Sequence, residues 1–151
     1  MEKLSGIALP PLLRRLYLQV GNGGFGPGYG LLGLRGGHTL DGGNALRAMQ
    51  AHRTPQPVPA EGPRVPLHIC DWGCAILSIL DLADGQVWGF DPNPVPEGVS
   101  PLFPQHITIT EWFARWLDGC LYQPWMLQDP DTGRCRGAIG TDYAGLFETT
   151  G

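Results

Sequence analysis

Residues 67–90 read LHICDWGCAILSILDLADGQVWGF, and this stretch decides the fold. Three apolar segments separated by turn-forming residues predict strands over 67–72, 74–82 and 86–90. Asp84-Gly85 is a strong hairpin signal between the last two segments, and Gly73 predicts a tight turn or a bulge between the first two. Because links this short join neighbouring antiparallel strands, the stretch predicts a meander.

A helix is predicted before this stretch, where aliphatic residues recur on one helical face: Leu9, Leu12, Leu13, Leu16 and Val20. Pro10 and Pro11 suit the first turn of such a helix, and Gly21 suits its end. The apolar run 29–34 that follows predicts a further strand.

A second helix is predicted over 108–121, where Thr108 and Glu111 have the spacing of a capping box. Its apolar side chains form two adjacent rows, one with Trp112, Trp116 and Cys120, the other with Phe113, Leu117 and Leu121. Burial of large aromatic side chains is strongly stabilising. We therefore expect these rows to pack on the sheet, with Arg115 and Asp118 facing outward.

The remaining segments predict shorter elements. Residues 44–53 favour a short helix, 129–134 favour a small hairpin, and proline favours extended loops over 54–66 and 91–106. Together the patterns predict an α+β protein with a mainly antiparallel sheet. We expect a single domain over 1–151, with its core at about 9–121 and a C-terminal extension at 122–151.

Composition is that of a globular protein, with 42% hydrophobic residues in 151. No apolar run approaches the roughly 20 residues that span a bilayer, so we expect a soluble, cytoplasmic protein. The four cysteines would then be free thiols.

Charge is distributed unevenly along the chain. Residues 1–70 hold three acids and seven bases, whereas 71–131 hold nine acids and a single base, Arg115. The acidic centre disfavours nucleic-acid binding, which needs clustered Lys and Arg. It would suit a basic protein partner, although an ordinary solvated acidic face has the same composition.

Residues 21–30, GNGGFGPGYG, place Gly21, Gly23 and Gly26 at the spacing of a dinucleotide-binding fingerprint. That fingerprint follows a strand and opens a helix, whereas here a helix is predicted before it and a strand after it. We therefore expect these glycines to supply left-handed backbone angles and close packing rather than a phosphate site.

His68, Cys70 and Cys74 suggest a metal site at first sight. The other two cysteines, Cys120 and Cys135, lack the second paired spacing of a zinc site. Cysteine in an apolar strand commonly behaves as a small hydrophobe. We expect no metal and no cofactor.

Asp71, Asp81 and Asp91 recur every ten residues near the ends of the three predicted strands. Converging carboxylates would suit an Asp-dependent hydrolase, but strand ends are also where solvated aspartates commonly lie. No nucleophile motif accompanies them. We therefore do not expect an enzyme, and keep the hydrolase as the less favoured alternative.

Several of these segments resemble, in order, the SUKH superfamily of Smi/Knr-type domains. Its N-terminal motifs correspond to Leu9-Pro10, Asn22-Gly23-Gly24 and Gly30-Leu31-Leu32. Its central hairpin corresponds to Trp72-Gly73-Cys74, Asp81, Gly85-Gln86-Val87 and Asp91-Pro92. The following helix is similar at 109–117, and 118–125 is similar to the tail of one bacterial branch. The resemblance covers most of 9–131.

The resemblance implies a twisted, mainly antiparallel sheet with helices packed against it. It also implies a role, because bacterial SUKH proteins are typically immunity proteins that bind and neutralise toxins, often nucleases. Fungal relatives are regulatory scaffolds, which gives the alternative of an adaptor with a non-toxin partner. The family often has a longer N-terminal helix than the eight residues before Leu9 allow, so we expect another element to cover that part of the sheet.

The family has no fixed contact motif, so the expected partner-binding residues come from physical arguments alone. An exposed tryptophan ringed by carboxylates makes a good interface anchor. We therefore expect the partner, a cognate toxin with a basic surface, at Asp71, Trp72, Asp84, Trp88 and Asp91. The alternative, that Trp72 and Trp88 are packing residues, remains open.

Overall fold

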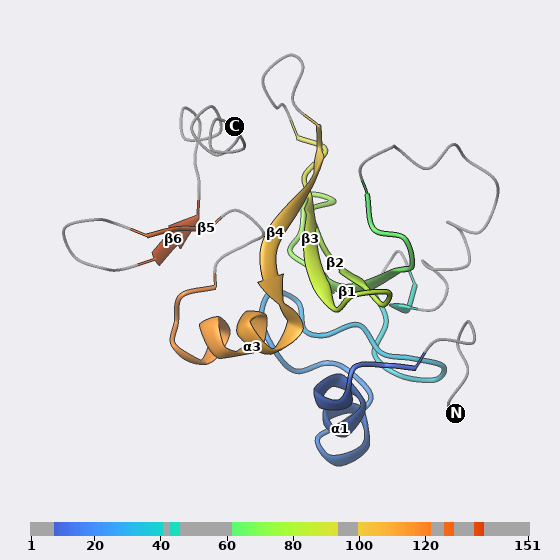
Figure 1. Ribbon diagram of the computed structural model, residues 1–151. Coiled ribbons are helices and arrows are strands. Elements are labelled where there is room, and N and C mark those ends of the chain that lie inside the picture. The colour runs from blue at the N-terminus through green and yellow to red at the C-terminus, as the bar shows by residue number, and fades with distance from the viewer. Residues whose placement is uncertain are drawn as a thin grey trace.

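The computed structural model describes residues 8–40, 43–45, 62–93, 100–121, 126–128 and 135–137, the last two stretches by their backbone only. A four-stranded antiparallel sheet in the order β1-β2-β3-β4 carries two helices (Figure 1). Its strands are β1 (Pro66–Asp71), β2 (Leu77–Asp81), β3 (Gln86–Phe90) and β4 (Leu102–Thr108). The helices are α1 (Pro11–Gln19) and α3 (Ile109–Leu117). The α+β class and the antiparallel sheet are confirmed.

The predicted meander of three strands forms the first three strands of this sheet. β3 has the predicted bounds, and β1 differs from its prediction by one residue at each end. β2 is shorter than the predicted 74–82, because Cys74 and Ala75 have positive φ angles of 51° and 62° and belong to a turn. Gly85, at φ 78°, closes the predicted hairpin turn between β2 and β3.

β4 lies where a proline-rich loop over 91–106 was predicted, so that prediction is wrong for residues 102–106. The strand tolerates Pro104 because β4 is at the edge of the sheet, where one side of the strand needs no ladder hydrogen bond. Pro104 pairs with Trp88, while Ile107 pairs with the neighbouring Val87. The two residues between Pro104 and Ile107 therefore form a bulge, in which His106 has φ 54°.

The predicted N-terminal helix is present as α1, with Pro10 as its N-cap and Pro11 in its first turn. Leu13 is completely buried, and the Tyr17 hydroxyl donates a 2.7 Å hydrogen bond to the Leu32 carbonyl oxygen. These two contacts fix the helix against the segment that follows it. Val20, expected on the buried face, is 62% exposed.

The predicted strand over 29–34 is not a regular strand. It lies along the edge of β1, where Leu31 and Cys70 form an isolated antiparallel bridge and Leu32 N–H donates to the Ile69 carbonyl oxygen at 2.8 Å. The backbone of this segment also lies very close to neighbouring backbone at its glycines. A Cβ on Gly33 would lie 2.3 Å from the His38 nitrogen, and one on Gly23 would lie 2.5 Å from the Leu31 oxygen. The expected left-handed angles and close packing of the glycines are confirmed.

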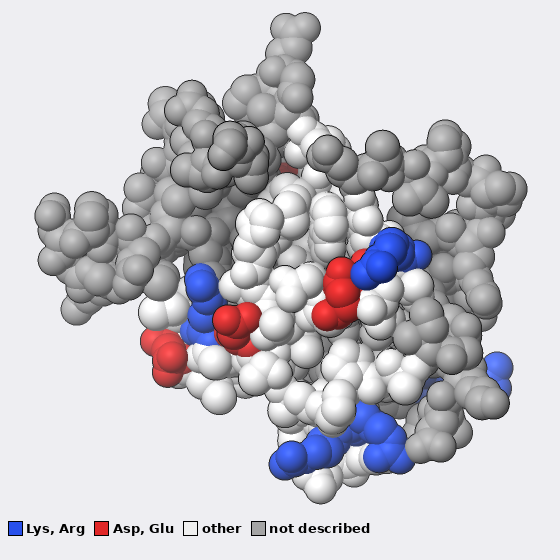
Figure 2. Space-filling model, in the orientation of Figure 1, with Lys and Arg blue, Asp and Glu red and all other residues white. Residues whose placement is uncertain are grey.

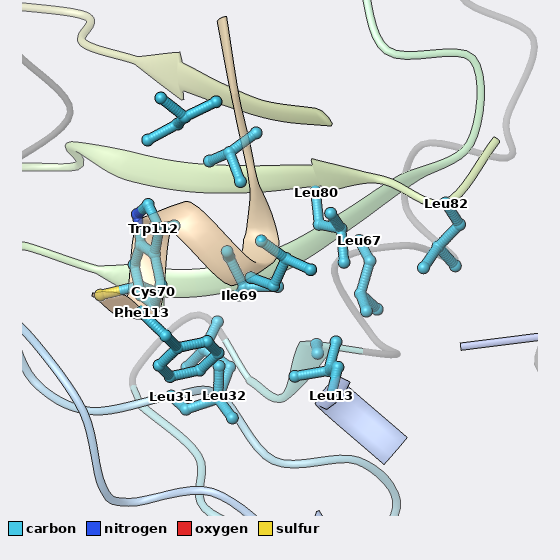
Figure 3. Close-up of a cluster of buried hydrophobic side chains, with 14 of the residues drawn as sticks. Leu13, Leu31, Leu32, Leu67, Ile69, Cys70, Leu80, Leu82, Trp112 and Phe113 are labelled. Carbon is cyan, nitrogen blue, oxygen red and sulfur yellow. The ribbon is translucent and has the colours of Figure 1, made fainter. Parts of the chain in front are cut away.

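Both helices contribute to the core on one face of the sheet: α3 packs directly against β3 and β4, whereas the 20–40 segment lies between α1 and the strands, and α1 reaches the core through Leu13 (Figure 1). The core joins Leu13 of α1 and Trp112 and Phe113 of α3 to Leu67, Ile69, Leu80 and Val87 of the sheet. Figure 3 shows the side chains from the sheet facing Leu13, Leu31 and Leu32 across this core.

α3 begins with the predicted capping box between Thr108 and Glu111. The expectation that its whole apolar surface is buried is confirmed for Trp112 and Phe113 but wrong for Leu117, which is 76% exposed. The helix ends at Leu117, four residues before the predicted end, and Gly119 at φ 71° turns the chain.

Beyond α3, β5 (Met126–Gln128) pairs antiparallel with β6 (Cys135–Gly137), which confirms the small hairpin predicted around 129–134. The helix predicted over 44–53 falls, apart from its first two residues, outside the described residues. Among the described helices, none is long and apolar enough to cross a membrane.

Candidate functional site

The turn between β1 and β2 contains the most unusual backbone of the described residues. Gly73, Cys74 and Ala75 are three consecutive residues with positive φ angles, of 89°, 51° and 62°. A residue with a Cβ loses roughly 1–2 kcal/mol in this left-handed conformation. Two such residues in succession persist only when their surroundings hold them, and strain of this kind is concentrated at functional sites. We call these three residues the 73–75 turn.

The turn is held from within by hydrogen bonds of its flanking residues. The Asp71 carboxylate accepts a 2.7 Å hydrogen bond from the Gly73 N–H. Trp72 N–H donates to the Ile76 carbonyl oxygen, and Ile76 N–H donates to the Gly73 carbonyl oxygen, both at 2.9 Å. The turn therefore has a fixed conformation before any partner arrives.

The segment after β3 holds the turn from a second side, through Asn93 and the Asp91 carboxylate that binds it. Asp91 is only 1% exposed and accepts hydrogen bonds from the Asn93 N–H at 3.0 Å and from its Nδ2 at 2.7 Å. The same Nδ2 donates to the Cys74 carbonyl oxygen at 3.2 Å. Asn93 thus connects the turn to the neighbouring strand.

Tyr29 lies against the outside of the turn. Its N–H donates to the Asp71 carbonyl oxygen at 3.1 Å, and its ring is close enough that a Cβ on Gly73 would lie 3.1 Å from ring atom Cε2. Tyr29 is nevertheless 62% exposed, and Cys74 and Ala75 are exposed as well. Tyr29 and the 73–75 turn together form a rigid, solvent-facing surface with an aromatic side chain.

Trp72 supports this surface from below. Its indole Nε1 donates a 2.9 Å hydrogen bond to Ser78 Oγ, and its ring meets that of Trp112 edge to face at 6.3 Å between centroids. These contacts make Trp72 a packing residue, which is the alternative that the sequence left open. Its contact with a partner stays a prediction.

The other two predicted contact residues lie elsewhere. Trp88 is half-buried and is opposite Ile79 and Pro104 on the face of the sheet away from the helices, because its neighbour Val87 faces the core. Asp84 lies in the β2–β3 turn, where Arg64 binds its carboxylate at 3.0 Å. Of the five predicted residues, the structure brings together Asp71, Trp72 and Asp91.

The three regularly spaced aspartates do not converge. Asp71 is opposite Leu77 at one end of the sheet, whereas Asp81 is opposite Pro66 at the other. Asp81 is buried and accepts 2.9 Å hydrogen bonds from the N–H groups of Arg64, Val65 and Ala83. Burial alone would raise the pKa of Asp81, but these hydrogen bonds and the Arg64 charge outweigh it and lower the pKa. Through these hydrogen bonds, Asp81 connects the chain before β1 to the β2–β3 turn.

The thiols are also separated. Cys70 is buried, with its Sγ 3.4 Å from the Pro27 carbonyl oxygen, and this burial raises its pKa, with a smaller contribution from Asp71. Cys74 is exposed and Cys120 half-buried. Within the described residues, no three side chains of His, Cys, Asp or Glu form a group that could hold a metal ion.

Sequence reasoning missed Tyr29 and Asn93 as members of the site. Asn93 had a local signal, since an aspartate two residues before it favours an Asx-type turn. Tyr29 had none, because only the fold of the glycine segment brings it beside residue 73. Comparison of the chain with protein-family models, curated proteins and solved structures found no match.

Proposed function

We propose that the protein is a non-catalytic binding protein, and specifically an immunity protein of the SUKH type that neutralises a cognate toxin. The observation that carries this proposal is the preformed 73–75 turn, which the Asp71 carboxylate and the Asn93 amide hold in a strained conformation while Tyr29 remains exposed beside it. A surface with a fixed backbone loses little conformational entropy on binding, which favours affinity. An exposed aromatic side chain with two rotatable bonds is a suitable anchor.

The charge of the chain favours a basic partner. Residues 71–131 carry a net charge of −8, and the half-buried Asp71 lies directly beside the proposed surface. Complementary charge accelerates association and selects among partners. A nuclease toxin, which needs a basic cleft for its own substrate, matches this chemistry and would be met in the cytoplasm.

The resemblance to the SUKH superfamily supports the same proposal through residues with identified structural roles. Leu9-Pro10 precedes α1, and Asp91-Pro92 follows β3 at the proposed surface. An adaptor with a non-toxin partner would use the same preformed surface. A hydrolase would have to rely on Asp71 and Asp91 alone, because Asp81 lies at the other end of the sheet.

The test is co-expression with the protein encoded by the adjacent gene. We expect the wild-type chain to rescue growth and to form a stable complex, and Cys74→Lys, which places a bulky cation on the exposed turn, to abolish both. Thr110→Lys, at an exposed position of α3, is the matched control and should retain rescue. A complex without toxicity would favour the adaptor. Equal rescue and equal affinity with both variants would refute the proposed surface.

A further inference from the structure

Asp71 and Tyr29 meet at Gly73, which has no side chain to separate them. The Asp71 carboxylate accepts the 2.7 Å hydrogen bond from the Gly73 N–H. The Tyr29 ring lies where a Cβ of Gly73 would point, with Cε2 at 3.1 Å and Oη at 3.2 Å from that position. A carboxylate and an aromatic ring are therefore neighbours at the start of the 73–75 turn.

The backbone of Tyr29 is fixed on both sides. Its N–H donates to the Asp71 carbonyl oxygen at 3.1 Å, and its own carbonyl oxygen accepts a 3.1 Å hydrogen bond from His38 Nε2. A Cβ on the preceding Gly28 would lie 2.8 Å from the same Asp71 oxygen, so a side chain there would prevent this approach. Because Tyr29 is 62% exposed, a side chain on a fixed backbone offers its ring to solvent.

The charge of Asp71 is not neutralised by the described part of the chain. Most acidic side chains on the face that Figure 2 presents have a basic side chain beside them. Asp84, for example, binds Arg64 at 3.0 Å. Asp71 forms no ion pair within the described residues, and its half-buried carboxylate can accept further hydrogen bonds besides the one from the Gly73 N–H. A cation of the partner would supply the opposite charge.

We infer that Asp71 and Tyr29 bind an arginine side chain of the protein partner, an inference that rests on the proposed function and names the group that its surface recognises. The guanidinium group stacks on the Tyr29 ring and donates hydrogen bonds to the Asp71 carboxylate. Both contacts suit a planar cation with several N–H donors, whereas the ammonium group of lysine is compact and strongly hydrated. Arginine and tyrosine are also enriched among the residues that dominate binding at interfaces.

The experiment titrates the full chain, labelled with nitrogen-15, with the end-blocked tripeptide Gly-Arg-Gly and follows the Gly73 amide resonance by NMR, which measures weak binding. Two further peptides replace the arginine with lysine, or with citrulline, which has the same shape without the charge. We expect the affinity to fall about threefold with lysine and about tenfold with citrulline. Binding of the arginine peptide should also weaken with salt.

Variants of the chain assign the two contacts. Asp71→Asn keeps an oxygen for the Gly73 N–H but removes the charge, and should bind the arginine peptide about fivefold more weakly. Tyr29→Ala should lose about threefold, and Tyr29→Phe, which keeps a ring, should recover most of that loss. Asp118→Asn removes the same charge at the exposed end of α3 and should lose less than about twofold. Unchanged thermal unfolding of the variants excludes misfolding as the cause.

The inference is overturned if the arginine peptide leaves the Gly73 resonance unmoved, or if the arginine and lysine peptides bind equally. Equal losses for Asp71→Asn and Asp118→Asn, or an unchanged affinity of Tyr29→Ala, would also overturn it. These measurements need no toxin, so they are separable from the co-expression test. Rescue of growth without arginine binding would remove this site alone, whereas arginine binding without rescue would keep the site and refute the immunity role.

Discussion

Asn93 Nδ2 donates a 3.2 Å hydrogen bond to the Cys74 carbonyl oxygen, and this bond joins the strained β1–β2 turn to the end of β3. The nitrogen also donates to the buried Asp91 carboxylate at 2.7 Å. One amide group therefore links a buried carboxylate to a strained turn. The rigidity of the proposed binding surface depends on this pair.

Asn93→Ala should destabilise the protein by about 1 kcal/mol, because a hydrogen bond is lost and the Asp91 carboxylate loses a donor. Urea unfolding measures this difference. The Ile76 amide, which donates to Gly73 inside the turn, should exchange with solvent faster in the variant. Thr110→Ala on the exposed side of α3 is the control, and an Ile76 exchange rate equal to that of the control would contradict the role of Asn93.

Ala75→Gly should stabilise the free protein by up to about 1 kcal/mol, because glycine adopts φ 62° without the strain of a Cβ. Ala83→Gly is the matched control. Ala83 is exposed in the next turn and is not among the positive-φ residues, so its replacement should destabilise the protein. Denaturant midpoints measure both effects, and destabilisation by both variants would show that Ala75 is not strained.

Asp81→Asn should destabilise the protein at pH 7 by about 1–3 kcal/mol, since three backbone N–H groups lose a charged acceptor. The folded protein lowers the pKa of Asp81, so the contribution of its charge is fully present above the unfolded value near 4 and disappears as the pH falls through the folded value. Urea unfolding of both proteins between pH 7 and pH 2 measures the difference between their free energies of unfolding. This difference should decrease only below about pH 4. A difference that does not depend on pH would mean that the charge of the Asp81 carboxylate does not contribute to stability.

Gly33→Ala should destabilise the protein by more than about 2 kcal/mol, because its Cβ would lie 2.3 Å from the His38 nitrogen and 2.5 Å from the Asn22 oxygen. Gly36→Ala provides the comparison. Gly36 has φ 74° but nothing within 4 Å of its Cβ, so only conformational strain of about 1 kcal/mol is expected. Thermal unfolding separates the two, and equal losses would show that the glycine segment is less closely packed than described.

The sequence predicted the parts of the fold that local chemistry determines. The Asp84-Gly85 turn signal defined the start of β3, the spacing of Thr108 and Glu111 defined the start of α3, and two prolines defined the start of α1. In each of these cases, residues near the end of the element make the hydrogen bonds or set the backbone angles that define that end. The local sequence pattern is then sufficient to predict it.

The sequence could not predict features that depend on distant neighbours. Residues 102–106 were expected to be loop because proline disfavours central strands, and only the edge position of β4 removes that objection. Nothing in the residue types of Cys74 and Ala75 indicates left-handed backbone, which the side chain of Asn93 helps to impose. The face of the sheet on which a residue lies also depends on distant packing. The helices pack on one face and Trp88 lies on the other, so Trp88 is separated from the other expected binding residues.

Hydrogen exchange of the full chain, alone and with the protein encoded by the adjacent gene, tests the central claim most directly. We expect the complex to slow exchange of the amides of the exposed residues Cys74 and Ala75 and of the Tyr29 segment. Slowed exchange restricted to other residues, or no complex between the two proteins, would contradict the account of this turn as a protein-binding surface.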